Sequence, residues 1–132
     1  MESLIVNSKP DTPFIDFDAE KGRMLIQGRA IPQDADKFWA PVLKWFYAYS
    51  ATPNKKTKVV FNMEYYNIST SKQLLFILHQ LNEIQEAGND VEVEWKYAKE
   101  DLEMKEAGVD FSCIVDIPFS FICVESTLSE SV

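Results

Sequence analysis

Three hydroxyl side chains stand together where a predicted strand gives way to a predicted helix. Ser69, Thr70 and Ser71 follow an apolar segment at 59–66 and precede a helical apolar pattern expected to run on from Lys72. The first N–H groups of a helix have no partners within it, and the helix dipole makes that end positive. A side-chain oxygen or a phosphate is therefore well accommodated there, which suits either a helix cap or a phosphate acceptor.

Both interpretations of this turn are open from the residues alone. As a cap, Thr70 with Gln73 three positions later matches a capping box. As a switch, phosphorylation would add nearly two negative charges to a binding surface. The candidate phosphorylation sites are Ser69 and Thr70; Ser69 is the freer, because Thr70 would first have to leave its cap. The candidate partner-binding residues flank them: Asn67, Ser71 and Lys72.

The sequence contains no recognisable catalytic, metal or cofactor motif. Its single histidine, His79, lies between apolar and polar helix positions and is expected at the helix edge. Cys113 and Cys123 are too isolated for a metal site or a disulfide framework, so we expect reduced, core-type thiols. No Gly-rich phosphate loop or nucleophile elbow occurs. We therefore predict no catalytic residues, no metal and no cofactor, and a protein that is not an enzyme.

The net charge of the chain limits the classes of partner that it can bind. The 132 residues carry a formal charge of −8 and a sequence pI of about 4.6, which disfavours nucleic acid and anionic lipid. No run approaches the ~20 apolar residues of a membrane span, and the first residues lack a signal-peptide pattern. We expect a cytoplasmic protein, without membrane insertion, that meets a basic patch on a protein partner.

The elements that must position the turn follow from periodicity. Segment 12–18, with Pro13 at its start, and segment 23–28 are expected to form the two strands of a hairpin. Residues 4–6 suit a short edge strand or a segment that lies against the core. A helix starting near Asp36 or Pro41 has one apolar stripe that leaves Tyr47 outside it. Gly88 is expected to end the second helix, and 91–97 alternates as a half-buried strand.

The last third of the chain continues the strand–helix alternation. Residues 99–107 are expected to form a helix or a structured loop that Gly108 ends. The acidic segment 101–110 is either a solvated face or a docking strip for a basic partner. A final strand is expected from about Phe119, and the tail from Glu125 should be frayed. The fold class is α/β: a mixed sheet with packed helices in a single domain, residues 1–132.

An alternative function is a small apolar-ligand carrier, with the aromatic-rich helices enclosing a pocket.

Several short motifs are spread over nearly the whole chain. They are Thr12-Pro13-Phe14-Ile15-Asp16-Phe17-Asp18, Gly28 with Pro32, Phe38, Pro41 and Trp45, Glu64 to Lys72, Val91 to Tyr97, Glu106-Ala107-Gly108-Val109-Asp110 and Ile117-Pro118-Phe119. In this order and spacing they resemble the SiaC family of small bacterial regulatory phosphoproteins, whose fold is similar to the STAS domains of anti-sigma-factor antagonists.

The resemblance implies a STAS-like partner switch. A cognate protein kinase would phosphorylate the turn before the central helix, and a PPM-type phosphatase would reverse it. In the best-known system the unphosphorylated form binds and activates a diguanylate cyclase. Two positions depart from the family pattern. Ile68 stands where the family's acceptor threonine is placed, so either Ser69 or Thr70 takes over or phosphate does not switch this chain. Arg29-Ala30 replaces a more usual acidic–serine pair.

Overall fold

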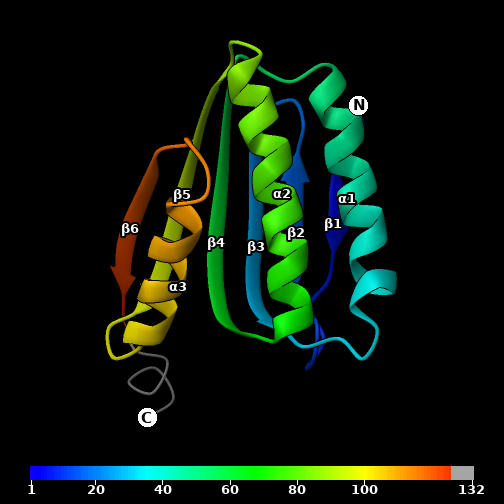
Figure 1. Cartoon of the computed structure of the whole chain (residues 1–132). Helices are drawn as coiled ribbons and strands as arrows, with labels where there is room; N and C mark the ends of the chain where they lie inside the picture. The colour runs from blue at the N-terminus through cyan, green and yellow to red at the C-terminus, as the bar shows by residue number, and fades with distance from the viewer. Residues whose placement is uncertain (126–132) are drawn as a thin grey trace.

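Six strands form one mixed sheet in the computed structural model, which describes residues 1–125 (Figure 1). The strands lie side by side in chain order, β1-β2-β3-β4-β5-β6. Their bounds are β1 Leu4–Val6, β2 Phe14–Asp18, β3 Arg23–Ala30, β4 Lys56–Tyr66, β5 Asp90–Ala98 and β6 Phe119–Val124. The helices are α1 Ala35–Ala51, α2 Ile68–Glu86 and α3 Leu102–Ser112. The predicted α/β class, opening hairpin and alternation of strands and helices are confirmed.

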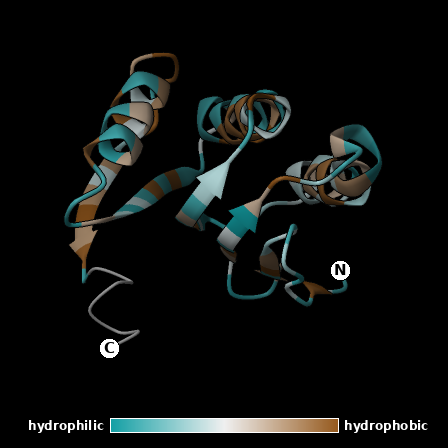
Figure 2. Cartoon of the chain, turned by 90° about the horizontal axis from the view of Figure 1, so that it is seen from below, coloured by the Kyte–Doolittle hydropathy of each residue, from teal (hydrophilic) through white to brown (hydrophobic). Residues whose placement is uncertain are grey.

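The connections decide where the helices lie. Strands β1 to β3 pair antiparallel, whereas β3 to β6 are parallel and are joined through α1, α2 and α3. The three crossover connections have the same handedness, and each leads to the next strand in the same direction across the sheet. All three helices therefore lie on one face of the sheet, as Figure 2 shows. The three helices consequently all begin at the carboxyl edge of the parallel strands, the lower edge in Figure 1.

The core lies between this sheet and its helices. One row of side chains runs in register across the sheet: Ile15, Ile26, Phe61 and Trp95, all fully buried. The apolar stripes of α1 and α2 cover it, with Trp39 and Leu74 fully buried and Tyr47 left exposed. The opposite face carries mostly polar side chains. The prediction that residues 91–97 form a half-buried strand is thus confirmed: one face lies toward the helices and the other toward solvent.

Three local expectations were wrong or are now decided, and a fourth is not tested. Pro41 lies inside α1, which begins at Ala35, so the helix does not start at the proline. Gly108 does not end α3 but lies within it. Cys113 and Cys123 are free, as expected, but exposed rather than buried. The predicted frayed tail lies outside the described residues, apart from Glu125 itself.

Gly108 sits inside α3 because Trp95 leaves no room for a side chain. An added Cβ would lie 2.5 Å from the indole of Trp95, whose N–H donates to the Met104 carbonyl at 2.9 Å. A real Cβ essentially never approaches this closely, so α3 would have to move away from β5. The glycine is therefore a packing requirement at the α3–sheet contact.

We predict that Gly108→Ala lowers the free energy of unfolding by about 1–3 kcal/mol through overpacking. Urea denaturation measures this, with the exposed Glu106→Ala on the same helix as control. Alanine is the better helix former by about 1 kcal/mol, so a stabilised variant would contradict the packing argument.

Candidate functional site

The candidate site is the junction between the end of β4 and the start of α2. The helix begins at Ile68, four residues earlier than the expected start at Lys72, and Asn67 is its N-cap. The Asn67 side chain accepts the Thr70 N–H at 2.9 Å, and its carbonyl accepts the Ser71 N–H at 3.0 Å. The predicted capping box is therefore wrong: Thr70 is inside the helix and Asn67 caps it.

Thr70 is fully buried and holds three elements together. Its hydroxyl donates to the Ala30 carbonyl at the end of β3 at 3.0 Å. The same oxygen accepts the indole N–H of Trp39, on α1, at 3.4 Å. With no exposed surface and both hydrogen-bonding roles used, this hydroxyl is out of reach of a kinase in the folded protein.

Gln73, the other half of the expected capping box, also points inward. It is buried, and its amide donates to the Asp36 carboxylate in the first turn of α1 at 2.8 Å. Asp36 thereby ties the starts of α1 and α2 together. This contact joins residues 37 positions apart, so sequence spacing carries no signal for it.

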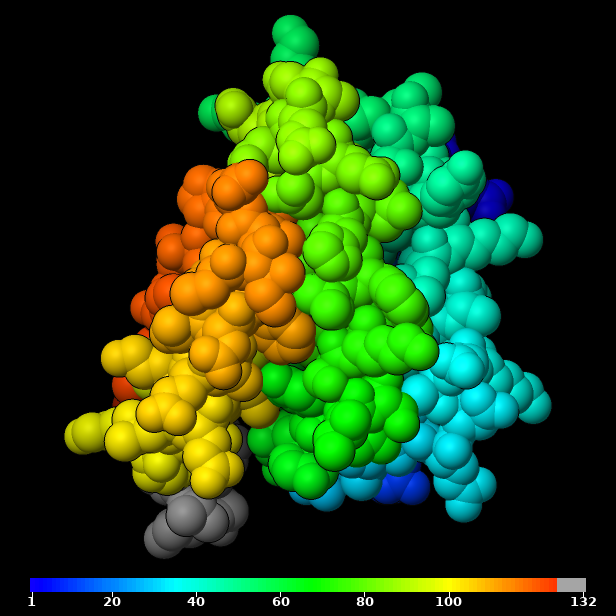
Figure 3. All heavy atoms as spheres, in the orientation of Figure 1, coloured from blue at the N-terminus to red at the C-terminus, as the bar shows by residue number. Residues whose placement is uncertain are grey.

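The outer side of the same turn is open to solvent. Ile68 is 89% exposed, the most exposed large apolar side chain among residues 1–125. Ser69 is exposed, whereas the Ser71 hydroxyl donates to the Ile68 carbonyl at 2.6 Å. In the space-filling view this turn reaches the lower surface between α1 and α3 (Figure 3). Ser69 is thus the accessible hydroxyl of the two acceptor candidates.

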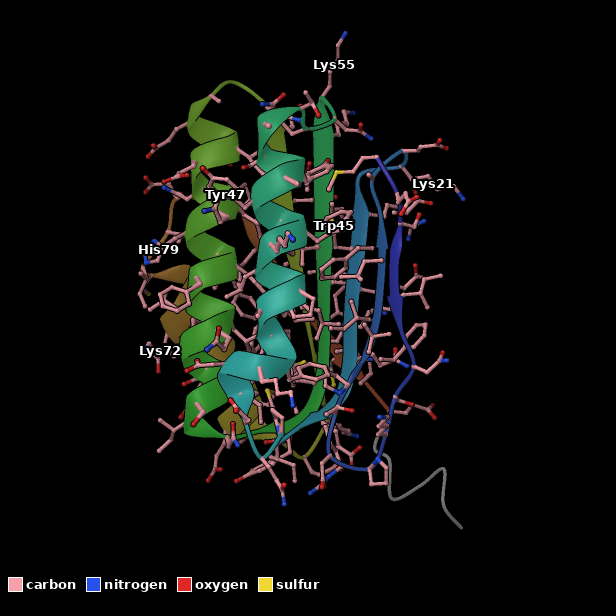
Figure 4. All side chains as sticks on the ribbon, turned by 90° about the vertical axis from the view of Figure 1, so that its right-hand side faces the viewer. Lys21, Trp45, Tyr47, Lys55, Lys72 and His79 are labelled. Atoms are coloured by element: carbon pink, nitrogen blue, oxygen red, sulfur yellow. The ribbon has the colours of Figure 1, made fainter. Side chains whose placement is uncertain are left out.

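Lys72 lies on the outer side of α2, one turn beyond Ile68. It is exposed, and its ammonium sits 5.9 Å from the ring centroid of Phe76. Figure 4 shows Lys72 and His79 along this outer side. The structure therefore brings Ile68, Ser69 and Lys72 onto one solvent-facing surface. His79, which was expected at the helix edge, is exposed farther along the same helix.

The neighbouring strand ends add a cluster that sequence analysis did not single out as a site. The register of β3 against β4 shifts between Gly28 and Arg29, and Gly28 has a φ of 111°. Arg29 lies 3.9 Å from the Glu64 carboxylate and 5.7 Å from the ring centroid of exposed Tyr65. A glycine ahead of a charged residue near a strand end was the available signal for such a bulge.

Tyr66, the last residue of β4, is partly buried next to the junction. Burial of the phenol, with the nearby Asp110 carboxylate as the second cause, raises the pKa of Tyr66 to about 12. Asp110 belongs to α3, so the end of β4 lies within electrostatic range of the third helix. The acidic segment 101–110 is accordingly not all solvated surface: Asp101 caps α3 by accepting the Met104 N–H at 3.1 Å.

Two grooves bear on the ligand-carrier alternative. One of about 760 Å³ lies at the opposite end of the parallel strands and is lined by Lys21, Arg23, Lys56 and Lys58 among others. The other, of about 390 Å³, lies on the open sheet face beside Asp16 and Lys96. Neither is enclosed by the aromatic side chains of α1 or α2. Those aromatics instead pack on one another, as in the stacked Trp45–Tyr49 pair.

Residues 1–125 offer no group of three or more potential metal ligands. Within the same range, none of the helices is long and apolar enough to span a membrane. The arrangement at the junction is thus a surface: an exposed apolar residue, an accessible hydroxyl and a helix terminus.

Comparison with known proteins assigns the family. The sequence profile of the SiaC family of regulatory phosphoproteins matches residues 6–124. An uncharacterized protein of Pseudomonas aeruginosa (strain UCBPP-PA14) is 25% identical over 120 residues, which cover 91% of this chain and 95% of that protein.

Solved structures from Pseudomonas aeruginosa share the fold. Apo-SiaC matches with a TM-score of 0.87 at 24% identity, covering 92% of this chain and 99% of its own. Another SiaC structure gives 0.85 at 25% identity, covering 94% and 100%. The third contains SiaC as activator in complex with the diguanylate cyclase SiaD, with a TM-score of 0.87, 24% identity and coverage of 92% and 99%. The chain belongs to the SiaC family of regulatory phosphoproteins.

We predict that Thr70→Val destabilises the protein by about 1–3 kcal/mol, because it leaves the buried Trp39 N–H without an acceptor. Ser69→Ala should change stability by less than about 0.5 kcal/mol, since its side chain is exposed. Urea unfolding of the two variants makes the comparison. Equal effects would show that the Thr70 hydroxyl does not hold the junction.

The raised pKa of Tyr66 predicts a late phenol titration. In an ultraviolet pH titration of the folded protein, one phenol should ionise at about pH 12, and Tyr66→Phe should remove that step. The neutral buried phenol contributes stability fully below its unfolded pKa of about 10, and this is lost as the pH rises toward 12. Loss of a step near pH 10 in the variant would refute this assignment.

Proposed function

We propose that this chain acts as a non-enzymatic, partner-binding regulator whose contact surface is the exposed start of α2, and that phosphorylation of Ser69 controls it. Residues 1–132 would work as one cytoplasmic domain. The observation that carries the proposal is the contrast between two neighbouring hydroxyls. Thr70 is fully buried and hydrogen-bonded on both sides, whereas Ser69 stands in solvent at the positive end of a long helix.

The first turn of α2 can accommodate a phosphate. It contains no acidic side chain, whereas α1 has Asp36 and α3 has Glu103 in that position. An anion near a helix N-terminus is favoured by the dipole, typically by about 0.3–1 kcal/mol. Lys72 follows Ser69 by three residues, a spacing that places two side chains on neighbouring positions of the helix surface. Phosphate would therefore leave the fold intact.

The same phosphate would change the contact surface. Ile68 projects beside Ser69 and is almost entirely exposed, as an anchor for an apolar pocket on a partner would be. A doubly charged group next to that anchor would have to be dehydrated for the contact to form. Unphosphorylated protein would bind, and phosphorylated protein would be released.

The family supports the class of partner. SiaC of Pseudomonas aeruginosa is described as the activator of the diguanylate cyclase SiaD and has been crystallised with it. We therefore extend to this chain a diguanylate cyclase as binding partner, with a cognate kinase and a PPM-type phosphatase setting the state of Ser69. Asn67 and Ser71 would shape the turn, since both bond its backbone, while Ile68 and Lys72 meet the partner.

Charge substitutions at exposed Ser69 and at partly buried Ser71 test the switch. Ser69→Asp should weaken binding of the cognate cyclase at least about tenfold, and Ser69→Ala should leave it within about twofold. Isothermal titration with purified cyclase measures both. Ser71→Asp is the matched control for added charge, because its side chain turns back onto the helix.

Mass spectrometry after incubation with the cognate kinase tests the acceptor. Ser69 should carry the phosphate and Thr70 should not. A kinase that modifies neither residue would refute phosphate control while leaving partner binding at Ile68 open to the titration. Unchanged binding by both Ser69→Asp and Ile68→Asp would place the contact surface elsewhere.

A further inference from the structure

The strand β6 forms one rim of the sheet and has an unusual composition for an edge. It lies at the left-hand side of Figure 1, beyond β5, with α3 on one face. Its six residues, Phe119–Val124, contain no charged side chain and no proline. Natural proteins usually protect edge strands with charged residues, with proline or by keeping the strand very short, because the unpaired backbone groups of an edge can pair with another strand.

The other rim of the sheet follows that rule. Its edge strand β1 has three residues. The chain after it turns through Lys9 and Pro10, and Lys9 forms a narrow bridge with Thr12. Of the two edges among the described residues, β6 alone is long enough and apolar enough to template a further strand.

The hydrogen-bond phase of β6 can be assigned from its contacts with β5. The carbonyls of Pro118 and Val124 accept N–H groups from β5 residue Val93 and from Lys99, at 2.9 and 3.2 Å. Because backbone groups alternate along a strand, even-numbered residues face β5. The N–H and C=O groups of Phe119, Phe121 and Cys123 consequently face away from the sheet.

The outward-facing backbone groups of β6 can pair with the same groups of a second copy. A two-fold axis beside Phe121, perpendicular to the sheet, would pair Phe121 with Phe121 of a second copy and Phe119 with Cys123 of that copy. Each outward-facing residue would then meet another outward-facing residue, as an antiparallel ladder requires. Such an isologous contact closes at two copies and leaves no new edge at the junction.

The ladder along β6 would bring no charged side chains together. The chain has a net charge of −8, so two copies repel wherever charged surfaces meet. Pairing along β6 opposes only uncharged side chains, and Glu125, just beyond the strand, would lie opposite Ile117 of the second copy. No like charges therefore face each other along the ladder.

We infer that β6 pairs antiparallel with β6 of a second copy, extending the six-stranded sheet across a two-fold axis. The contact is short compared with the ~800 Å² per partner of a standard interface, so the association should be weak, in the micromolar range. The start of α2 is not part of this rim, so the dimer would leave the proposed partner surface open. The inference does not rest on the proposed function.

A substitution at Cys123 tests the edge without disturbing β5. Proline there removes only an N–H that faces outward, a position where edge strands tolerate it. In sedimentation equilibrium of the full chain, wild type should show a concentration-dependent dimer. Cys123→Pro should raise the dimer Kd at least about tenfold. The matched control Cys123→Ser keeps the N–H, removes the exposed thiol and should dimerise like wild type.

Amide exchange of wild-type protein, followed by NMR, gives a second test that needs no variant. The amides of Phe119, Phe121 and Cys123 should gain protection as protein concentration rises, whereas those of Ser120 and Ile122 should be protected throughout. A chain that stays monomeric at millimolar concentration overturns the inference. So does a dimer that persists in Cys123→Pro, or one in which the odd-numbered amides stay unprotected.

Discussion

The junction depends on one buried hydroxyl. The Thr70 side chain donates to the end of β3 and accepts from Trp39 of α1, so a single oxygen fixes α2 against two elements. Because that residue points inward, helical geometry turns the two preceding residues outward. The exposure of Ile68 and Ser69 therefore follows from the burial of Thr70. Asn67 completes the arrangement by capping the helix, a task for which the hydroxyls are not needed.

The sheet topology explains why the site is a surface and not a pocket. Open α/β sheets bind small ligands in the crevice where the strand order reverses and helices change face. Here the order runs from β1 to β6 without reversal, and the helices of the described chain all cover one face. The carboxyl edge of the strands is therefore lined by helix starts standing side by side. Such an edge presents side chains to solvent.

The same sequential order makes β1 and β6 the edge strands of the sheet within residues 1–125, and the two edges differ. The amino-terminal rim is a three-residue strand, held near its start by the Trp45 indole donating to the Glu2 carbonyl at 2.9 Å. The carboxyl-terminal rim is twice as long and uncharged. The candidate site at the start of α2 and the β6 edge therefore occupy different parts of the molecule.

The sequence by itself determined the α/β class, the order of elements, the alternating strand 91–97 and the family, because these depend on local periodicity and on motifs in series. The candidate turn at residues 67–72 is likewise a prediction from the sequence. Only the tertiary structure decided which hydroxyl is available, because the partners of Thr70 come from 31 and 40 residues away. Gly108 was misread for the same reason: its role is set by Trp95, on another element. Ser, Thr and Asn can all cap a helix, so residue type could not choose among them, and distant packing did.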